Sequence, residues 1–269
     1  MNSSPSKEPI SPQVMRMSDR LIQWTHMTPD DLDAAIEHMP VALVPCGSLE
    51  WHGPHLGTGC DSLRGHALCT GVAERLDGGV VLPPIYITAP GFCNWRGSMF
   101  FTPALVKQVA AEMFRELEKC GFKTVLMLLA HAGPMQDESF GEPAEEYMKT
   151  SDMRIIVRSG PKTMPEVRLG GGHAQAEETA ELLAAAPDAV KLDRYDPDAT
   201  LIPKYEGCDP ELYCRGLSDQ HHESVRRFMG REHYEWQDDL AEVVTPEAAQ
   251  VFFNETCDAL ADELREALG

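Results

Sequence analysis

Short apolar runs alternate with amphipathic segments along most of the chain. Residues 41–45, 80–82, 85–87, 124–129 and 154–157 have the length and composition of buried parallel strands. Apolar residues recur at helical spacing, in several cases behind capping residues, over residues 28–38, 61–76, 102–121, about 143–149, 174–185 and 246–268. Residues 190–192 fit a short edge strand, and residues 193–240 show little periodicity. This alternation predicts an α/β fold, with helices on both sides of a mostly parallel central sheet in three α/β/α layers.

The chain ends differ in character from the patterned region. Residues 1–18 are polar and contain Ser and Pro, so we expect a flexible N-terminal arm followed by a single domain over residues 19–269. No apolar run reaches the roughly 18 residues of a membrane-spanning helix, and the N-terminus lacks the apolar core of a secretory signal. The eight cysteines form no C-x-x-C pair, which is typical of reduced thiols. We therefore expect a cytoplasmic protein with no membrane partner.

The net charge excludes one class of partner. The 269 residues carry 43 Asp and Glu against 23 Lys and Arg, a formal charge of −20, and no dense basic patch interrupts this excess. Such a chain repels phosphate backbones, so no nucleic-acid partner is expected. A small-molecule substrate remains compatible with the acidic surface.

Potential metal ligands gather in three loops that follow predicted strands. The first loop carries Glu50 and His52 and runs to Asp61, the second carries His131, and the third leads through His173 to Glu178. Because functional loops of a parallel sheet meet beyond the carboxyl ends of its strands, we expect the three loops to converge.

The donor types suggest a particular class of ion. Carboxylates mixed with imidazoles suit Zn, Mn or Fe, whereas all-oxygen sites suit Mg or Ca. Glu50 and His52 are two residues apart, so an extended backbone points both the same way. An aspartate such as Asp61 can bridge two ions, although it is equally placed to cap the following helix. Likewise, His131 alone fits a buried hydrogen-bonded histidine, and His173 with Glu178 fits a solvated helix start.

One segment carries a family resemblance. Residues 47–56, GSLEWHGPHL, with Asp61 eleven residues after Glu50, resemble the G-S-x-E-Q-H-G-P-H-L signature of the creatininase family of metal-dependent hydrolases. Residues 172–179, GHAQAEET, resemble the family's later G-H-A-x-x-x-E-[ES]-T pattern, and residues 129–134, LAHAGP, keep the His and one Gly of its N-G-H-G-G-N pattern. The resemblance spans roughly residues 38–193 in matching order.

The resemblance implies a binuclear centre of two divalent ions (Zn²⁺, Mn²⁺ or Fe²⁺) on a creatininase-like sheet. It implies that Glu50, Asp61 and His131 hold one ion and that His52, Asp61 and Glu178 hold the other. By the same resemblance His173 is the nearby proton shuttle, and the chain forms a homo-oligomer, a hexamer in relatives. We expect a metal-activated hydroxide to attack a polarised carbonyl, with His173 protonating the departing nitrogen.

Three departures from the family pattern favour a substrate other than creatinine. Trp51 replaces the usual Gln, the residues flanking His131 lose both Asn positions, and residues 95–98 read Trp-Arg-Gly-Ser where relatives have F-P-G-T. Trp95 could stack on a substrate ring and Arg96 could anchor a carboxylate or phosphate. The alternative is a core Trp and a surface Arg.

Three functions are therefore open. The first is hydrolysis of a small cyclic amide or another C–N carbonyl substrate, and the second is cleavage of a C–C or ester bond in a cyclic keto-sugar, an inosose or a lactone. The third is a non-catalytic binding protein on the same scaffold. Glu177 is expected to face solvent about 100° around the helix from Glu178, His55 to support either the ligands or the loop, and His221, His222 and His233 to lie at the surface or at the pocket mouth.

Overall fold

The strands and helices follow one another in the order that the sequence pattern predicts. The structure is a computed structural model and describes residues 22–92, 94–198, 204–205, 209–215, 217–230 and 234–269, so the expected arm of residues 1–18 lies outside it. In chain order the elements are α1 (Pro29–His38), β1 (Val41–Cys46), α2 (Cys60–Leu76), β2 (Val80–Val81), α3 (Pro103–Cys120), β3 (Thr124–Leu129), α4 (Gln136–Met148), β4 (Arg154–Arg158), α5 (Ala176–Ala185), α6 (Pro210–Cys214), α7 (Asp219–Gly230), α8 (Leu240–Val243) and α9 (Pro246–Leu268).

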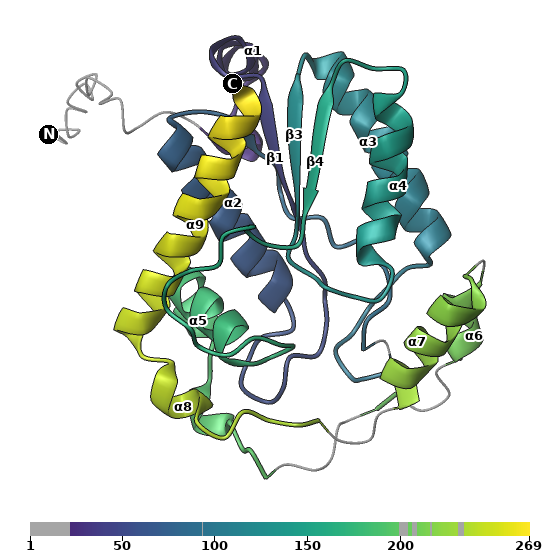
Figure 1. The fold of residues 1–269 in the computed structure, drawn as a ribbon, viewed down its shortest axis with the longest axis vertical. Coiled ribbons are helices and arrows are strands. Elements are labelled where there is room, and N and C mark those ends of the chain that lie inside the picture. Colours follow the sequence, from purple (N-terminus) through teal and green to yellow (C-terminus); the bar gives the residue numbers. More distant parts are fainter. Residues whose placement is uncertain (1–21, 93, 199–203, 206–208, 216, 231–233) are drawn as a thin grey trace, which may run out of the picture.

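The four strands of the described residues form one parallel sheet in the order β2-β1-β3-β4. Figure 1 shows β1, β3 and β4 side by side. The two central strands pair over their whole length, from Val41 opposite Thr124 to Cys46 opposite Leu129. The carboxyl ends of β1 and β3 therefore lie side by side, which brings the loops that follow them to the same edge of the sheet.

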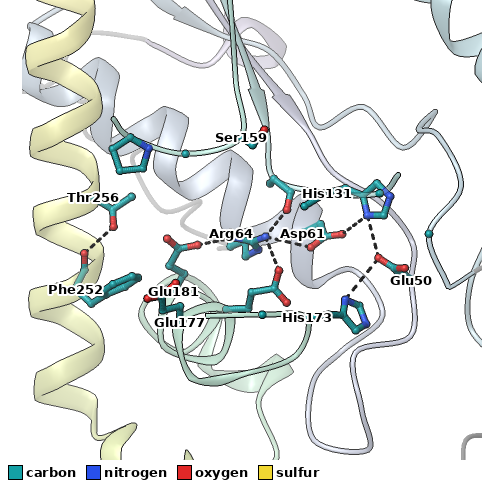
Figure 2. A pocket seen from close by; sticks show the side chains of 18 of the residues that line it. Glu50, Asp61, Arg64, His131, Ser159, His173, Glu177, Glu181, Phe252 and Thr256 are labelled. Atoms are coloured by element: carbon teal, nitrogen blue, oxygen red, sulfur yellow. Dashed lines mark hydrogen bonds and ion pairs between the residues drawn. The ribbon is translucent and has the colours of Figure 1, made fainter. Parts of the chain in front are cut away.

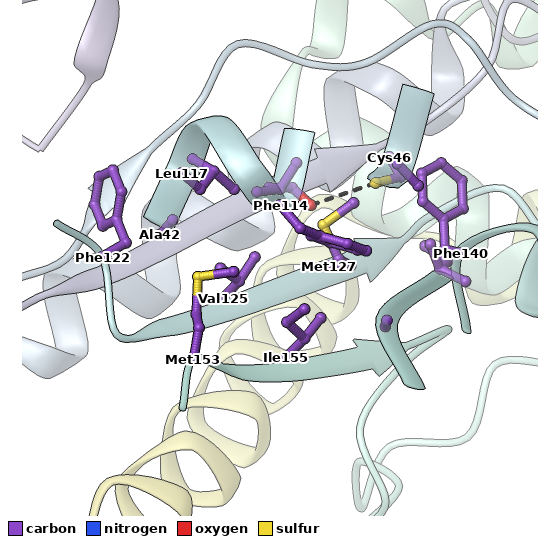
Figure 3. Packing of buried hydrophobic residues seen from close by; sticks show 14 of the residues in the cluster. Ala42, Cys46, Phe114, Leu117, Phe122, Val125, Met127, Phe140, Met153 and Ile155 are labelled. Carbon is purple, nitrogen blue, oxygen red and sulfur yellow. Dashed lines mark hydrogen bonds between the residues drawn. The ribbon is translucent and has the colours of Figure 1, made fainter. Parts of the chain in front are cut away.

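The two faces of the sheet build two separate apolar layers. Val44 and Met127 pack with side chains of α3 and α4, including the fully buried Phe114. Figure 3 shows Met127, Phe114 and Phe140 in this layer. Leu43 and Leu126, which alternate with them along the strands, pack with α2 and α9 on the opposite face. Because successive side chains of a strand point to opposite faces, continuous apolar runs are what a sheet covered on both sides requires. The expected three α/β/α layers are present.

Capping signals in the sequence set several helix starts. Thr28 accepts a hydrogen bond from the Asp31 amide while Asp31 accepts one from the Thr28 amide, and Pro29 opens α1. Thr102 before Pro103 and Thr245 before Pro246 repeat the Thr-Pro start at α3 and α9. These predicted boundaries are confirmed.

Two predicted strands are wrong. Residues 85–87 make a single bridge, Cys46 with Ile85, because Pro83 and Pro84 cannot donate to a sheet ladder. Val190 likewise makes one antiparallel bridge, with Leu56, and lies between the short 3₁₀ turns Pro187–Ala189 and Leu192–Arg194.

Helical content exceeds the prediction in two places. Helix α4 begins at Gln136 and carries Pro143 in its interior, where the sequence suggested a start near that proline. The weakly periodic residues 193–240 contain α6 and α7 in their described part, and α8 begins at their last residue, Leu240. None of the helices in the described residues is both long enough and apolar enough to span a membrane.

Candidate metal centre

Polar side chains converge at the carboxyl ends of β1 and β3, as Figure 2 shows. Glu50 and His52 come from the loop after β1, Asp61 from the first turn of α2, and His131 from the loop after β3. All four side chains are at most 3% exposed. Glu50, Asp61 and His131 border a cavity of about 460 Å³ that extends past Arg64 towards Phe252 and Thr256 of α9.

Glu50, Asp61 and His131 form one close group. Nδ1 of His131 lies 2.9 Å from Oε2 of Glu50 and 3.3 Å from Oδ2 of Asp61. One donor atom from each of the three residues lies within 4.8 Å of the other two, so a single ion can contact all three. The remaining oxygen of Glu50 accepts the Phe92 amide at 2.7 Å, which fixes the carboxylate plane.

His52 and Glu178 lie on the other side of Asp61. Nε2 of His52 is 3.0 Å from Oδ1 of Asp61 and 3.5 Å from Oε2 of Glu178. The two oxygens of Asp61 therefore face different imidazoles, the arrangement that an aspartate bridging two ions needs. The structure brings together Glu50, His52, Asp61, His131, His173 and Glu178, while their role as ligands or proton shuttle stays a prediction.

Backbone carbonyls orient all three imidazoles of the cluster. A carbonyl only accepts, so the nitrogen facing it carries the proton. Nδ1 of His52 donates to the Glu50 carbonyl at 3.1 Å, Nε2 of His131 to the Ala89 carbonyl at 3.1 Å, and Nε2 of His173 to the Trp51 carbonyl at 2.6 Å. The second nitrogen of each ring then faces the carboxylates. This outer hydrogen bond is the usual support of a metal-binding histidine.

The buried carboxylates and imidazoles of the cluster shift one another's pKa values. Burial is the largest single effect on the pKa of His131 and lowers it, but the charges of Glu50 and Asp61 and the hydrogen bonds to them together outweigh burial and raise that pKa to about 10. The charges of Asp61, Glu178 and Glu50, with the Asp61 hydrogen bond, likewise raise the pKa of His52 to about 9. Burial raises the pKa of Asp61, yet the charges of His52 and Arg64 and the hydrogen bonds of His131 and His52 together keep it well below the ordinary value. Without an ion, protons on the two imidazoles balance the carboxylates, and a divalent ion would displace them.

Two glycines make room for the cluster. A Cβ at Gly91 would lie 2.4 Å from Oε1 of Glu50, and one at Gly133 would lie 2.4 Å from Nε2 of His131. Both contacts are closer than any side chain tolerates, so only glycine lets the chain pass this near to Glu50 and His131.

An aromatic wall closes one side of the cluster. Trp51 packs edge-on to Trp95, with ring centroids 4.5 Å apart, and Trp95 stacks on Phe92 at 4.1 Å. Trp95 is fully buried and Arg96 is exposed, and neither is among the described residues that line the cavity. Their expected role in substrate binding stays a prediction.

Four polar groups near the cluster were not expected from the sequence. Ser48 donates to Oδ2 of Asp61 at 2.7 Å, and Arg64 binds both Glu178 and Glu181. Arg64 follows Asp61 by three residues and Glu181 follows Glu178 by three, the spacing of neighbours on one helix face, which was the available signal. The buried thiol of Cys60 lies within 4.8 Å of donor atoms of His52 and Asp61, and burial raises its pKa well above the ordinary value.

Two expectations about helix starts are wrong. Asp61 does not cap α2, because the helix begins one residue earlier, behind Gly59, and the Asp61 carboxylate turns inward to Ser48 and His52. Glu177 does not face bulk solvent: it lies half-buried in the first turn of α5 and lines the cavity. Burial raises its pKa above the ordinary value.

The remaining candidate histidines lie apart from the cluster of Glu50, Asp61 and His131. His55 is fully buried, pairs with the Thr179 hydroxyl at 3.3 Å and packs against Tyr195, so it orders the loop next to Glu178. His221 and His222 lie on α7 near Glu138 and Glu211 and do not line the described cavity. His233 lies outside the described residues.

The donor set fits divalent transition ions. Each imidazole presents one nitrogen towards a carboxylate oxygen and has its other nitrogen bound to the backbone. Mixed nitrogen and oxygen donors suit Zn²⁺, Mn²⁺ and Fe²⁺. Glu50, Asp61 and His131 would hold one ion, and His52, Asp61 and Glu178 a second.

Sequence comparisons place this architecture among known proteins. A family model described as "Creatininase: Creatinine amidohydrolase" matches residues 25–263. The chain is 27% identical over 187 residues to the creatinine amidohydrolase of Pseudomonas putida. This alignment covers 61% of this chain and 72% of that protein. The chain is also 27% identical over 177 residues to the mycofactocin precursor peptide peptidase of Mycolicibacterium smegmatis (strain ATCC 700084 / mc(2)155), covering 62% of this chain and 68% of that one.

Solved structures with the same fold agree. A crystal structure of creatinine amidohydrolase superposes with a TM-score of 0.65 at 19% identity and covers 91% of this chain and 97% of its own. A putative creatinine amidohydrolase from Bacteroides fragilis NCTC 9343 gives a TM-score of 0.67 at 17% identity, covering 92% and 96%. Other matching creatininase structures are described as an Mn form and as a Zn-Zn type. With a family model that spans most of its length, the chain belongs to the creatininase family.

Proposed function

We propose that this protein is a metal-dependent hydrolase that holds two divalent ions and cleaves a C–N bond of a small cyclic amide other than creatinine. One observation carries the proposal: His52 and His131 each bind a backbone carbonyl through one nitrogen and face Asp61 with the other. That arrangement serves ion binding and has no advantage in an ordinary packed core, where buried charges cost stability.

Divalent ions bound at this centre would lower the pKa of a water molecule towards 7 and polarise a carbonyl. Hydrogen bonds within the protein fix the proposed ligands. Glu50 is fixed by the Phe92 amide, Asp61 by the Ser48 hydroxyl, and Glu178 by the Ala174 amide at 2.7 Å. Ligands fixed in this way need not reorganise when substrate arrives.

His173 is suited to moving the proton. Its Nε2 donates to the Trp51 carbonyl, so Nδ1, 3.9 Å from Oε2 of Glu50, is the nitrogen that faces the reaction. Burial and then the charge of His52 lower the pKa of His173, so the ring is neutral at pH 7 and accepts a proton. The same nitrogen can then protonate the departing amine.

The surroundings argue against creatinine as the substrate. Trp51 occupies the position between Glu50 and His52 where the family signature has Gln, and it packs into the wall of Trp95, Tyr234 and Trp236 instead of offering an amide. The cavity also continues past Arg64 to Phe252. The cavity therefore has room for a cyclic amide larger than creatinine.

A peptide amide is the second candidate. The cavity of about 460 Å³ lies within the range of pockets that hold drug-sized ligands, and one similar protein is a peptide peptidase. Cyclic keto-sugars and lactones share the polarised carbonyl, so ligand geometry does not separate them from amides. Homo-oligomer formation stays a prediction of the family resemblance.

The test is a substrate panel assayed with and without ions. Chelated protein should be inactive on cyclic amides, formamides, lactones, keto-inositols, short peptides and creatinine. Adding Zn²⁺, Mn²⁺ or Fe²⁺ should restore turnover of an amide in the panel, but not of creatinine. Glu50→Gln should lose the ion held with Asp61 and His131 and should lose turnover, whereas Glu142→Gln, at an exposed ion pair on α4, should keep both ions and wild-type turnover. Less than about one ion per purified wild-type chain would instead support a non-catalytic binding protein.

A further inference from the structure

Arg64 is a buried cation at the edge of the candidate centre. It lies on α2 one turn after Asp61, its side chain is 12% exposed, and Figure 2 shows its guanidinium between Glu181 and Asp61. Nη1 donates to Oε2 of Glu181 at 2.7 Å, and Nη2 donates to Oε1 of Glu178 at 2.8 Å and to the Ala130 carbonyl. The guanidinium is thus anchored from three sides.

The two oxygens of Asp61 have different neighbours as a result. Oδ2 faces His131 at 3.3 Å and accepts from Ser48 at 2.7 Å, so its surroundings hold no permanent cation among the described residues. Oδ1 faces His52 at 3.0 Å and lies 3.4 Å from Nη2 of Arg64. An imidazole can lose its proton when an ion binds, whereas a guanidinium cannot.

We propose that Arg64 makes the two ion positions unequal, so that the position between Glu50, Asp61 and His131 fills first and the position at His52 and Glu178 binds its ion more weakly. The inference rests on the proposed function, because it assumes that two ions bind. Two effects of Arg64 act together at the second position. Its fixed charge repels a second cation nearby, and it occupies one oxygen of Glu178.

The structure shows how little of Glu178 is left for an ion. With Oε1 bound to Arg64, Oε2 is the oxygen near His52, at 3.5 Å, and it also accepts the Ala174 amide at 2.7 Å. Three groups of described donors fit within 4.8 Å of one another, and Glu178 is in none of them. Glu50, Asp61 and His131 form one group, whereas at the second position the third partner of His52 and Asp61 is the buried thiol of Cys60. The geometry therefore agrees with the charge argument.

Glu181 determines how strongly Arg64 repels a second cation. Its carboxylate neutralises part of the Arg64 charge, and it is 8% exposed, so little solvent screens the pair. Removing the Glu181 charge alone should leave Arg64 more strongly positive towards the second ion. Removing both charges should relieve the repulsion and free Oε1 of Glu178, while the balance of buried charge is kept.

The test is a titration of chelated full-length protein with Mn²⁺, followed by calorimetry and by electron paramagnetic resonance. The resonance signal distinguishes isolated ions from a coupled pair, and neither readout depends on activity. Wild type should bind one equivalent tightly and a second at least about tenfold more weakly. Arg64→Gln with Glu181→Gln should tighten the second equivalent on the order of tenfold, and Glu181→Gln alone should weaken it.

Two further variants separate charge from structure. Arg64→Lys keeps the charge and should retain unequal binding. Arg75→Gln, on the same helix but paired with Asp258 of α9, should match wild type in both steps. Two equal equivalents in wild type, or an unchanged second step in the doubly neutral variant, would overturn the inference and leave the proposed function standing. Absence of any tight Mn²⁺ in all five proteins would overturn both.

Discussion

The faces of β1 and β3 and the loops beyond the carboxyl ends of these strands are both buried, but by different kinds of side chain. Along the strands, Val44 and Met127 belong to an apolar cluster that includes side chains of α3 and α4. Phe114 is fully buried in this cluster, near Met127 in Figure 3. Just beyond the carboxyl ends, Glu50, Asp61 and His131 are buried to nearly the same extent but carry charge.

The difference lies in what each region needs in order to stay buried. Apolar side chains gain free energy from burial alone, roughly 25 cal/mol per Å². Buried carboxylates lose hydration and require a cation or a proton donor in return. The apolar layer can therefore be changed without affecting chemistry, whereas a change at the carboxyl ends should alter ion binding first.

Asp61→Asn should have the largest effect and would test whether the polar end depends on ions. The amide keeps the shape but removes the charge shared by the two proposed positions, and its nitrogen would face an imidazole. We expect loss of both ions and a fall in turnover on the order of a thousandfold. Metal analysis and assay of the variant measure this. Asp258→Asn, on the exposed face of α9, is the matched control, and wild-type metal content in Asp61→Asn would refute the assignment.

Phe114→Ala tests the apolar layer between the sheet and α3. Removing a fully buried ring should cost about 3–5 kcal/mol of unfolding free energy, since it loses burial and leaves a cavity. Urea denaturation measures the loss. The folded variant should still bind the wild-type amount of metal. Depleted metal in the folded variant would show that the two regions are not independent.

His55 tests the border between the regions. Burial and then the charge of His52 lower its pKa to about 4, while an unfolded histidine titrates near about 6.5. Between these values the unfolded chain binds more protons, so the stability from neutral His55 is complete above about pH 6.5 and is lost as the pH falls towards 4. The loss should reach about 2–3 kcal/mol in chelated protein and be absent in His55→Gln. Parallel urea-stability curves for the two proteins between pH 7.5 and 4.5 would contradict this account.

Ser48→Ala should have the smallest effect, confined to the polar end. The hydroxyl orients Asp61 at 2.7 Å, and such supporting hydrogen bonds are typically worth about 10-fold to 100-fold in metal affinity. Thr28→Ala, at the opposite end of the sheet, removes the cap of α1 and should cost about 1 kcal/mol of stability without changing metal affinity. Equal metal affinities of the two variants in competition with a chelator would remove the contrast.

Most of the layered fold follows from local patterns in the sequence. The continuous apolar runs at residues 41–45 and 124–129 need no context, because a strand buried on both faces has no polar side. Residues 85–87 are equally apolar, yet Pro83 and Pro84 remove the donors that would join them to a ladder. Helix α4 starts before Pro143 because packing against α3 and β4 outweighs the local signal of a proline.

The candidate site was predictable only where loop position decides it. Glu50 and His131 follow adjacent parallel strands, so their convergence follows from topology. Arg64 and Glu181 lie on different helices, and their contact depends on α2 packing against α5. The spacing of three residues places Arg64 on the helix face of Asp61 and Glu181 on that of Glu178. It does not show that Arg64 and Glu181 pair with each other, because that depends on how the two helices pack.

The central claim is that divalent ions lie among Glu50, Asp61 and His131, with a second position at His52. The most direct measurement is anomalous diffraction from crystals of the full-length protein grown with Mn²⁺, recorded on both sides of the Mn absorption edge. The account predicts a strong peak between Glu50, Asp61 and His131 and a weaker one on the His52 side of Asp61. Crystals in which Mn²⁺ gives no peak at these residues would contradict it.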